Sequence, residues 1–341
     1  MNSSAESTCS HVVPTLFITI TLIISLLAFM GNLLVTVTFL RTQSLRTNTN
    51  YYVVNMAVSD ILCSFFNWML YATEGMLTSR VMIARPSSLV LCKLGMYFRA
   101  VSQVVSVLSL VLIAVDRYVA VVFPLKAAKV DRRRVRLSLS ISTWIIPVAF
   151  GCPYIVYAQV VRVDDHTFCR LLWDKLAHTI FNAAGFVVFY CTPVMALIVL
   201  YTRIVKVLKK RPSADEGMRR PVINKRRKQH QKITKILISI VVAFFVCWTP
   251  LCVYLALKMF DPDLFAKDQC QIMLALFFYV FPSLSTAINP IILFLFSTNY
   301  GRALANLCLH MCSFLRSRTS PELTRNKRIA PLQTAIYQMT E

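Results

Sequence analysis

The chain has 341 residues, of which 57% are hydrophobic and 15% charged, and its formal net charge is +22. Its mean hydropathy of +0.60 argues against a water-soluble globular protein, because such a protein needs a larger polar surface. With only 7 glycines and no alternating ten-residue pattern, the sequence does not fit a transmembrane β-barrel.

Apolar segments of about 20 residues or more recur, and each is long enough to cross a bilayer core of about 30 Å at 1.5 Å per residue. The first segment is too long for a cleavable signal peptide, so we expect it to act as the targeting signal itself. The sequence therefore predicts an all-α membrane protein, a seven-transmembrane helix bundle with spans over 13–40, 50–78, 89–123, 136–157, 177–206, 231–258 and 271–296.

Basic residues are distributed unevenly between the two sets of connecting segments. They are frequent in 41–49, 124–135, 207–230 and 297–341 and sparse in 1–12, 79–88, 158–176 and 259–270. By the positive-inside rule, the N-terminus is extracellular and the C-terminus cytoplasmic, as in a multi-pass protein of the plasma membrane. We expect the basic run 225–228 to meet anionic lipid headgroups, and this distribution argues against nucleic-acid binding.

The chain has one domain, the helix bundle, and divides into four regions. We predict an extracellular N-terminus with a glycosylation sequon at Asn2, the bundle, a short amphipathic eighth helix on the membrane surface, and a polar cytoplasmic tail. The boundaries are 1–12, 13–296, 297–312 and 313–341.

Several polar side chains lie inside the predicted spans, where each one is costly. Asn32, Asp60, Ser106 and Asn289 are at depths that favour a hydrated ion or proton site. The alternative is a structural role, with Asp60 as a hydrogen-bond acceptor.

Motifs recur in all seven spans, in order and at matching depth. They are Gly31-Asn32, Asn55 to Asp60, Asp116-Arg117-Tyr118, Trp144, Pro193 with Tyr201, Phe244 with Cys247 to Pro250, and Asn289-Pro290. Over residues 15–312, this set resembles the rhodopsin-like (class A) G-protein-coupled receptors, and more closely their neuropeptide-receptor branch. The resemblance implies a receptor and not an enzyme, without an enzymatic cofactor. It would bind an extracellular ligand and activate a heterotrimeric G-protein, with arrestin and a receptor kinase as further partners.

The resemblance also implies an allosteric sodium ion. One carboxylate with hydroxyl and amide oxygens suits a small hard cation, and here the matching residues are Asp60, Ser106, Ser285 and Asn289, with Trp248 as the floor. Ser285 stands where many members have Asn. A water-filled polar network without sodium is the alternative.

The resemblance assigns Asp116, Arg117 and Tyr118 at the cytoplasmic end to G-protein coupling. We further expect Leu125 of the second inner loop to fill an apolar pocket of the G-protein beside Arg117. Many relatives hold the Arg with an acidic residue in the sixth span. Here that region reads His230 to Thr234, so Thr234 offers only a hydrogen bond.

The switch between states is implied at Pro193, Val107, Phe244, Trp248, Pro250, Asn289, Pro290 and Tyr201. Pro250 removes a backbone hydrogen bond and kinks the sixth span, so that its inner end can swing. The family's seventh-span motif ends in Tyr, whereas this chain has Leu293. Leu293 cannot join Tyr201 in a water network.

Eleven cysteines are present. Cys92 and Cys169 are predicted on the oxidising face, and the resemblance implies a disulfide between them. The segments Gln159 to Val163 and Thr167 to Leu172 flank Cys169 as two short strands, and Cys9 and Cys270 are a further candidate pair. Cys308 and Cys312 follow the last span on the inner side, which makes them candidates for palmitoylation.

For the ligand pocket we predict the residues Arg99, Gln103, Glu74, Tyr71, Trp248, Lys258 and Tyr279. Both signs of charge and an aromatic lining favour a short peptide. A small anionic metabolite held by Arg99 is the second candidate, and a simple pairing of Arg99 with Glu74 is the third reading.

The sequence argues against three other functions. A light-sensing opsin needs a Lys where Ser283 stands, and an aminergic receptor needs an Asp where Arg99 stands. A membrane transporter or channel is the rival of a different class, but the repeats and paired broken helices typical of transporters are not found.

Overall fold

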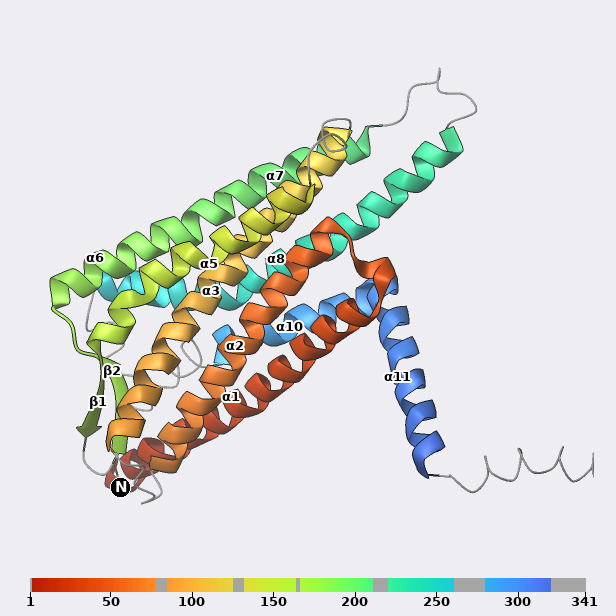
Figure 1. Ribbon diagram of the computed structural model, residues 1–341. Helices are drawn as coiled ribbons and strands as arrows, with labels where there is room; N and C mark the ends of the chain where they lie inside the picture. The colour runs from red at the N-terminus through yellow and green to blue at the C-terminus, as the bar shows by residue number, and fades with distance from the viewer. Residues whose placement is uncertain are drawn as a thin grey trace, which may run out of the picture.

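The computed structural model describes residues 2–77, 85–124, 132–163, 166–210, 220–260 and 280–319, and side chains within 16–70, 87–124, 134–161, 169–210, 224–257 and 280–309. Long helices run side by side in a bundle, with a two-stranded hairpin at one end and a separate helix projecting from the other (Figure 1). The helices are α1 (Asn2–Arg41), α2 (Asn48–Leu77), α3 (Arg85–Val122), α5 (Arg132–Tyr157), α6 (Lys175–Phe186), α7 (Thr192–Lys209), α8 (Arg220–Phe260), α10 (Phe281–Phe296) and α11 (Thr298–Thr319).

Shorter elements join these helices. A 3-10 turn, η1 (Gln43–Leu45), lies between α1 and α2, and a π-helical turn, η2 (Val187–Cys191), links α6 to α7. The strands β1 (Ala158–Val163) and β2 (His166–Leu171) pair antiparallel, with Val160 opposite Cys169. This hairpin confirms the two predicted strands.

Six of the described helical segments are long and apolar enough to cross a membrane, and α6, η2 and α7 together make one of them. The pair α10 and α11 meets the same test but bends by 90° at its break. The bend separates the seventh span from a surface helix, because α10 enters the bundle whereas α11 leaves it (Figure 1). The described bundle thus agrees with the predicted seven spans and eighth helix.

Several helices extend beyond their predicted bounds. α1 begins at Asn2 instead of residue 13, α8 begins at Arg220 instead of 231, and α11 continues to Thr319 instead of ending at 312. The added residues are mostly polar. Apolarity marks the part of a helix that can lie in lipid, whereas backbone hydrogen bonding continues until a breaker or a cap ends the helix. The predicted start of the seventh span at 271 lies outside the described residues.

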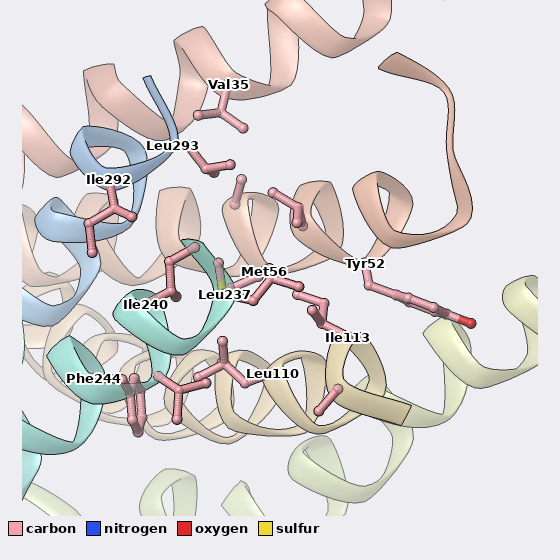
Figure 2. Close-up of a cluster of buried hydrophobic side chains, with 14 of the residues drawn as sticks. Val35, Tyr52, Met56, Leu110, Ile113, Leu237, Ile240, Phe244, Ile292 and Leu293 are labelled. Carbon is pink, nitrogen blue, oxygen red and sulfur yellow. The ribbon is translucent and has the colours of Figure 1, made fainter. Parts of the chain in front are cut away.

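The hydrophobic core lies in the half of the bundle away from the hairpin, where α1, α2, α3, α8 and α10 converge (Figure 2). Met56, Leu110 and Ile240 are each at most 1% exposed. Large apolar side chains also cover the outside, as at Leu295 and Leu137, which are 73% and 61% exposed. Such an outer surface is stable when hydrocarbon surrounds it.

Candidate functional site

A small polar cavity lies inside the bundle, between the hairpin end and the hydrophobic core. Its volume of about 10 Å³ corresponds to about one water-sized sphere. Residues from α2, α3, α8 and α10 line it: Asp60, Cys63, Asn67, Ser102, Gln103, Ser106, Phe244, Trp248, Pro282, Ser285, Thr286 and Asn289. All four predicted sodium ligands are in this set, together with Gln103 and Trp248 from the predicted ligand pocket.

Asp60 is the centre of the cavity's hydrogen bonds. Its Oδ1 accepts a hydrogen bond from Ser106 Oγ at 2.7 Å, and its Oδ2 accepts one from Asn289 Nδ2 at 2.9 Å. The carboxylate therefore joins α2 to α3 and α10. Asp60 is 1% exposed, and among the described residues it has no ion-pair partner.

The wall opposite Asp60 comes from α8 and α10. Trp248 Nε1 donates to Ser285 Oγ at 3.1 Å, and Ser285 Oγ donates in turn to the Pro282 carbonyl at 2.7 Å. Phe244 stacks below Trp248, with 5.9 Å between the ring centroids. The aromatic floor is thus tied to the polar wall by an indole hydrogen bond.

The donor set fits a small monovalent cation. A buried carboxylate needs a compensating charge, and three further buried oxygens or hydroxyls of the lining have no hydrogen-bond partner within the described part of the chain: Asn67 Oδ1, Ser102 Oγ and Asn289 Oδ1. No group of three His, Cys, Asp or Glu side chains that could hold a metal gathers in that part of the chain. One carboxylate with neutral oxygens suits sodium better than a multivalent ion.

At the inner end of α3, Arg117 pairs with its neighbour Asp116. Arg117 NH2 lies 2.7 Å from Asp116 Oδ2, and the two side chains are 13% and 18% exposed. Thr49 Oγ1 on α2 donates to the same carboxylate oxygen. The guanidinium is therefore neutralised within its own helix, and Asp116 is held by α2 as well.

Comparison with known proteins matches residues 31–293 to the family model of the seven-transmembrane receptors of the rhodopsin family. The chain belongs to this family. Among curated relatives, rat (Rattus norvegicus) neuromedin-U receptor 2 is 29% identical over 337 residues, covering 94% of this chain and 82% of its own length. Rat somatostatin receptor type 1 is 27% identical, covering 84% and 70%. Zebrafish (Danio rerio) galanin receptor 2b is 25% identical, covering 82% and 71%.

In the receptor, the N-terminal part of α8 is held by hydrogen bonds to its neighbours, and no acidic side chain among the described residues forms an ion pair with it. Gln231 Nε2 donates to the Leu208 carbonyl at 3.1 Å, and Arg227 NH1 donates to the Lys210 carbonyl at 3.3 Å. Lys232 Nζ donates to Thr298 Oγ1 at 3.4 Å. Thr234, expected to offer a hydrogen bond at this level, is buried without a partner in the described structure.

The predicted switch positions lie in and around the core. Val107 and Phe244 are each 5% exposed, and Pro193 is buried at the start of α7. Pro250 lies inside α8 and Pro290 inside α10. The hydroxyl of Tyr201 is buried without a partner among the described residues, and Leu293 is 5% exposed.

At the hairpin end of the receptor, the two strands are fixed to α3. The predicted disulfide joins Cys92 to Cys169, whose Cα atoms are 5.5 Å apart. Arg99 lies on α3, two turns deeper, and is partly exposed. Cys308, the first palmitoylation candidate, is exposed on α11. The remaining predicted positions lie outside the described side chains: Asn2, Cys9, Tyr71, Glu74, Leu125, Lys258, Cys270, Tyr279 and Cys312.

Sequence reasoning missed several residues that the receptor places at these sites. Ser59 Oγ lies 2.7 Å from the Oγ of Ser106, which itself donates to Asp60. Asn55 Nδ2 donates to Ser109 on α3 and to Thr143 on α5, while Trp144 Nε1 donates to Asn55 Oδ1. Ser and Thr are common in spans, so only their spatial neighbours distinguish them.

Proposed function

We propose that the receptor is activated by a short extracellular peptide and stimulates nucleotide exchange on a heterotrimeric G-protein. The peptide assignment is supported by the relatives, whose names include neuromedin-U, somatostatin and galanin receptors. The observation that carries it is the hairpin fixed to α3 by Cys92–Cys169, with the cationic Arg99 on the same helix. A hairpin with a cationic residue on the adjacent helix suits an extended ligand with many hydrogen-bonding groups.

The orientation belongs to the same proposal. The hairpin end with its disulfide faces the extracellular side of the plasma membrane, and the Asp116–Arg117 end faces the cytoplasm. Disulfides persist in oxidising surroundings, and the basic inner ends of α7 and α8 follow the positive-inside rule. An epitope placed at the N-terminus should be accessible to antibody on intact cells, and accessibility only after permeabilisation would contradict this orientation.

A sodium ion at Asp60 is the proposed cofactor. Asp60, Ser106, Ser285 and Asn289 would hold it, and its charge would compensate the buried carboxylate. These residues come from α2, α3 and α10, so a cavity of this size requires one particular packing of the three helices. Binding in that packing alone stabilises it at the expense of any other.

The test of the ligand is a screen with a charge reversal. Cells that express the receptor with a promiscuous G-protein are exposed to a library of short peptides and, separately, to small carboxylic acids. We expect a peptide to act, and Arg99→Glu to lower its potency by about tenfold or more, because the reversal turns a favourable charge contact into a repulsive one. Lys93→Glu makes the same charge change on the same helix, six residues nearer the hairpin, and serves as the control.

Two outcomes would contradict the peptide assignment. A response to carboxylic acids alone would favour the anionic-metabolite receptor, since Arg99 alone can hold such a ligand. Peptide potency that Arg99→Glu and Lys93→Glu change equally would mean that only the general charge of the outer end matters.

A further inference from the structure

A large apolar groove separates α7 from α8 on the outside of the bundle. Its volume is about 980 Å³, which is in the range of small-molecule sites. The floor consists of buried side chains, including Leu197 and Tyr201. The rims are open, because Ile198, Val242 and Val246 are 55%, 53% and 62% exposed. These rim residues face the hydrocarbon, so the groove opens sideways into the bilayer.

Two interhelical hydrogen bonds hold the two helices in fixed register along this groove. Tyr190 OH and Thr249 Oγ1 are 2.6 Å apart, and Gln231 Nε2 donates to the Leu208 carbonyl at 3.1 Å. The two contacts are 18 residues apart on each helix, from 190 to 208 and from 231 to 249, or about 27 Å. Because the two stretches between the contacts have the same number of residues, neither helix has to bend to form both contacts. The distance between the two contacts matches a hydrocarbon core of about 30 Å.

Positive charge lies beyond the inner end of the groove, where its lining ends at Tyr201 and Ile238. α7 and α8 contain no acidic residue. Lys235 precedes the rim residue Val242 by seven residues, and Lys209 follows Ile198 by eleven, so each lysine continues the line of its rim on the helix surface. Both lysines are exposed. Counted from the Gln231–Leu208 contact, they are about 8 Å apart along the helix axes, within reach of one phosphate by their flexible stems.

We propose that this groove binds an anionic phospholipid from the inner leaflet, with an acyl chain between α7 and α8 and the phosphate between Lys209 and Lys235. The groove is uncharged along the hydrocarbon region, and the two lysines lie near the level of the headgroups. A phospholipid of the bilayer matches this arrangement, because its acyl chains lie in the hydrocarbon and its phosphate lies at the headgroup level. A zwitterionic lipid fits the apolar part equally well but gains less from the two lysines.

The experiment uses the full-length receptor in phosphatidylcholine nanodiscs, without agonist or G-protein. One preparation contains a trace of phosphatidylglycerol with a diazirine in the middle of one acyl chain, and the other contains phosphatidylcholine with the same modified chain. After irradiation, labelled residues are mapped by mass spectrometry. We expect the phosphatidylglycerol probe to label Ile198, Val242 and Val246 up to about thirtyfold more than the phosphatidylcholine probe, from two lysine contacts.

Two pairs of substitutions separate the headgroup contact from general charge. Lys209→Gln with Lys235→Gln should reduce labelling by phosphatidylglycerol to the phosphatidylcholine level. Lys206→Gln with Lys225→Gln removes the same charge from the same helices, about a quarter of a turn away from the rims, and should change nothing. Val242→Trp fills the groove and should lower labelling of Ile198 by both probes.

The proposal is overturned if both probes label the groove equally, or if the two pairs of substitutions have equal effects. It is also overturned if labels are as frequent on Ile145 and Leu137 of α5, which are 62% and 61% exposed, because that pattern describes ordinary surrounding lipid. Since no agonist or G-protein is used, failure here leaves the proposed receptor function untouched.

Discussion

Asp60 is the residue whose burial demands most from its surroundings. A carboxylate that is 1% exposed loses its hydration, and two hydrogen bonds replace only part of it. Its donors are Ser106 on α3 and Asn289 on α10. Two oxygens of the same lining, Ser102 Oγ and Asn289 Oδ1, have no hydrogen-bond partner among the described residues. A single cation would satisfy the carboxylate and these oxygens together, which is why one residue can couple three helices.

The sodium proposal predicts an ion-specific gain in stability. Replacing KCl by NaCl at constant ionic strength should raise the melting temperature of the purified receptor, because a ligand that binds only the folded state stabilises it by about 2.7 kcal/mol at 100 times its Kd. Asp60→Asn should remove the difference between the two salts, since the amide keeps the shape but not the charge. Equal salt effects in both proteins would leave only the hydrogen-bonded network.

The sequence predicts the members of this site unequally. An Asp in an apolar span is conspicuous because it is costly there, so Asp60 and its motif partners could be predicted. The sequence does not predict the other members, Ser59, Asn67 and Ser102. A small polar side chain in a helix can form a hydrogen bond with its own backbone or with a neighbouring helix, and only the packing decides which. Ser59 does both, donating to the Met56 carbonyl and contacting Ser106.

At the scale of helices, α1 and α10 approach closely through Gly31. A Cβ atom at this position would lie 2.7 Å from Pro290 Cγ, and the proline ring cannot rotate away. Next to it, Asn32 Nδ2 donates to the Thr286 carbonyl at 3.0 Å. The glycine therefore sets the distance between the two helices at the level of the seventh-span motif.

Gly31→Ala should destabilise the receptor by about 1–3 kcal/mol, the usual cost of an added methyl group in a packed interior. The measurement is thermal unfolding of purified protein together with surface expression. Gly95→Ala is the matched control, because its added Cβ would lie 3.3 Å from Leu70 Cβ, a tight contact but a longer one than the 2.7 Å at Gly31. Equal loss in the two variants would show that helix-interior glycines, and not the approach to Pro290, determine the effect.

The inner end of α8 illustrates how hydrogen bonds substitute for an ion pair. The last carbonyls of a helix have no partner within it, and here Gln231 and Arg227 of α8 satisfy those of Leu208 and Lys210. The absence of an acidic residue here is visible in the sequence. The hydrogen bonds from Gln231 and Arg227 could not be predicted, since a contact between a side chain and a distant carbonyl leaves no sequence pattern.

Gln231→Ala should raise basal nucleotide exchange. Removing one hydrogen bond of about 1 kcal/mol shifts the balance toward an outward position of α8 by about fivefold. Gln229→Ala is the control, because Gln229 is exposed on the same turn of α8. The readout is guanine-nucleotide exchange by the receptor reconstituted with G-protein and no agonist. Unchanged exchange in Gln231→Ala would mean that α7 and α8 move as one unit.

On the scale of the whole molecule, the hairpin and the Asp116–Arg117 pair lie at opposite ends of α3. Residues 92 and 117 are separated by 25 positions, or about 37 Å along the helix. The seven spans could be predicted because lipid imposes length and apolarity on each, whereas the polar helix ends could not. α3 alone is rigid, so coupling between the ends must pass through its contacts with the helices that move.

Binding at the two ends must then be reciprocal. If the G-protein favours the state that binds agonist, it raises the affinity of the receptor for agonist. The agonist must then raise the affinity for the G-protein by the same factor, commonly about 5–150-fold. We expect this rise for the peptide found in the screen, measured by radioligand binding with nucleotide-free G-protein.

Arg117→Ala should keep the low-affinity binding of agonist and lose the rise in affinity. Arg136→Ala removes the same charge from the same end, where Arg136 lies 3.6 Å over the Tyr51 ring, and should keep the rise. A rise that survives in Arg117→Ala would exclude Arg117 as the contact through which the two ends communicate.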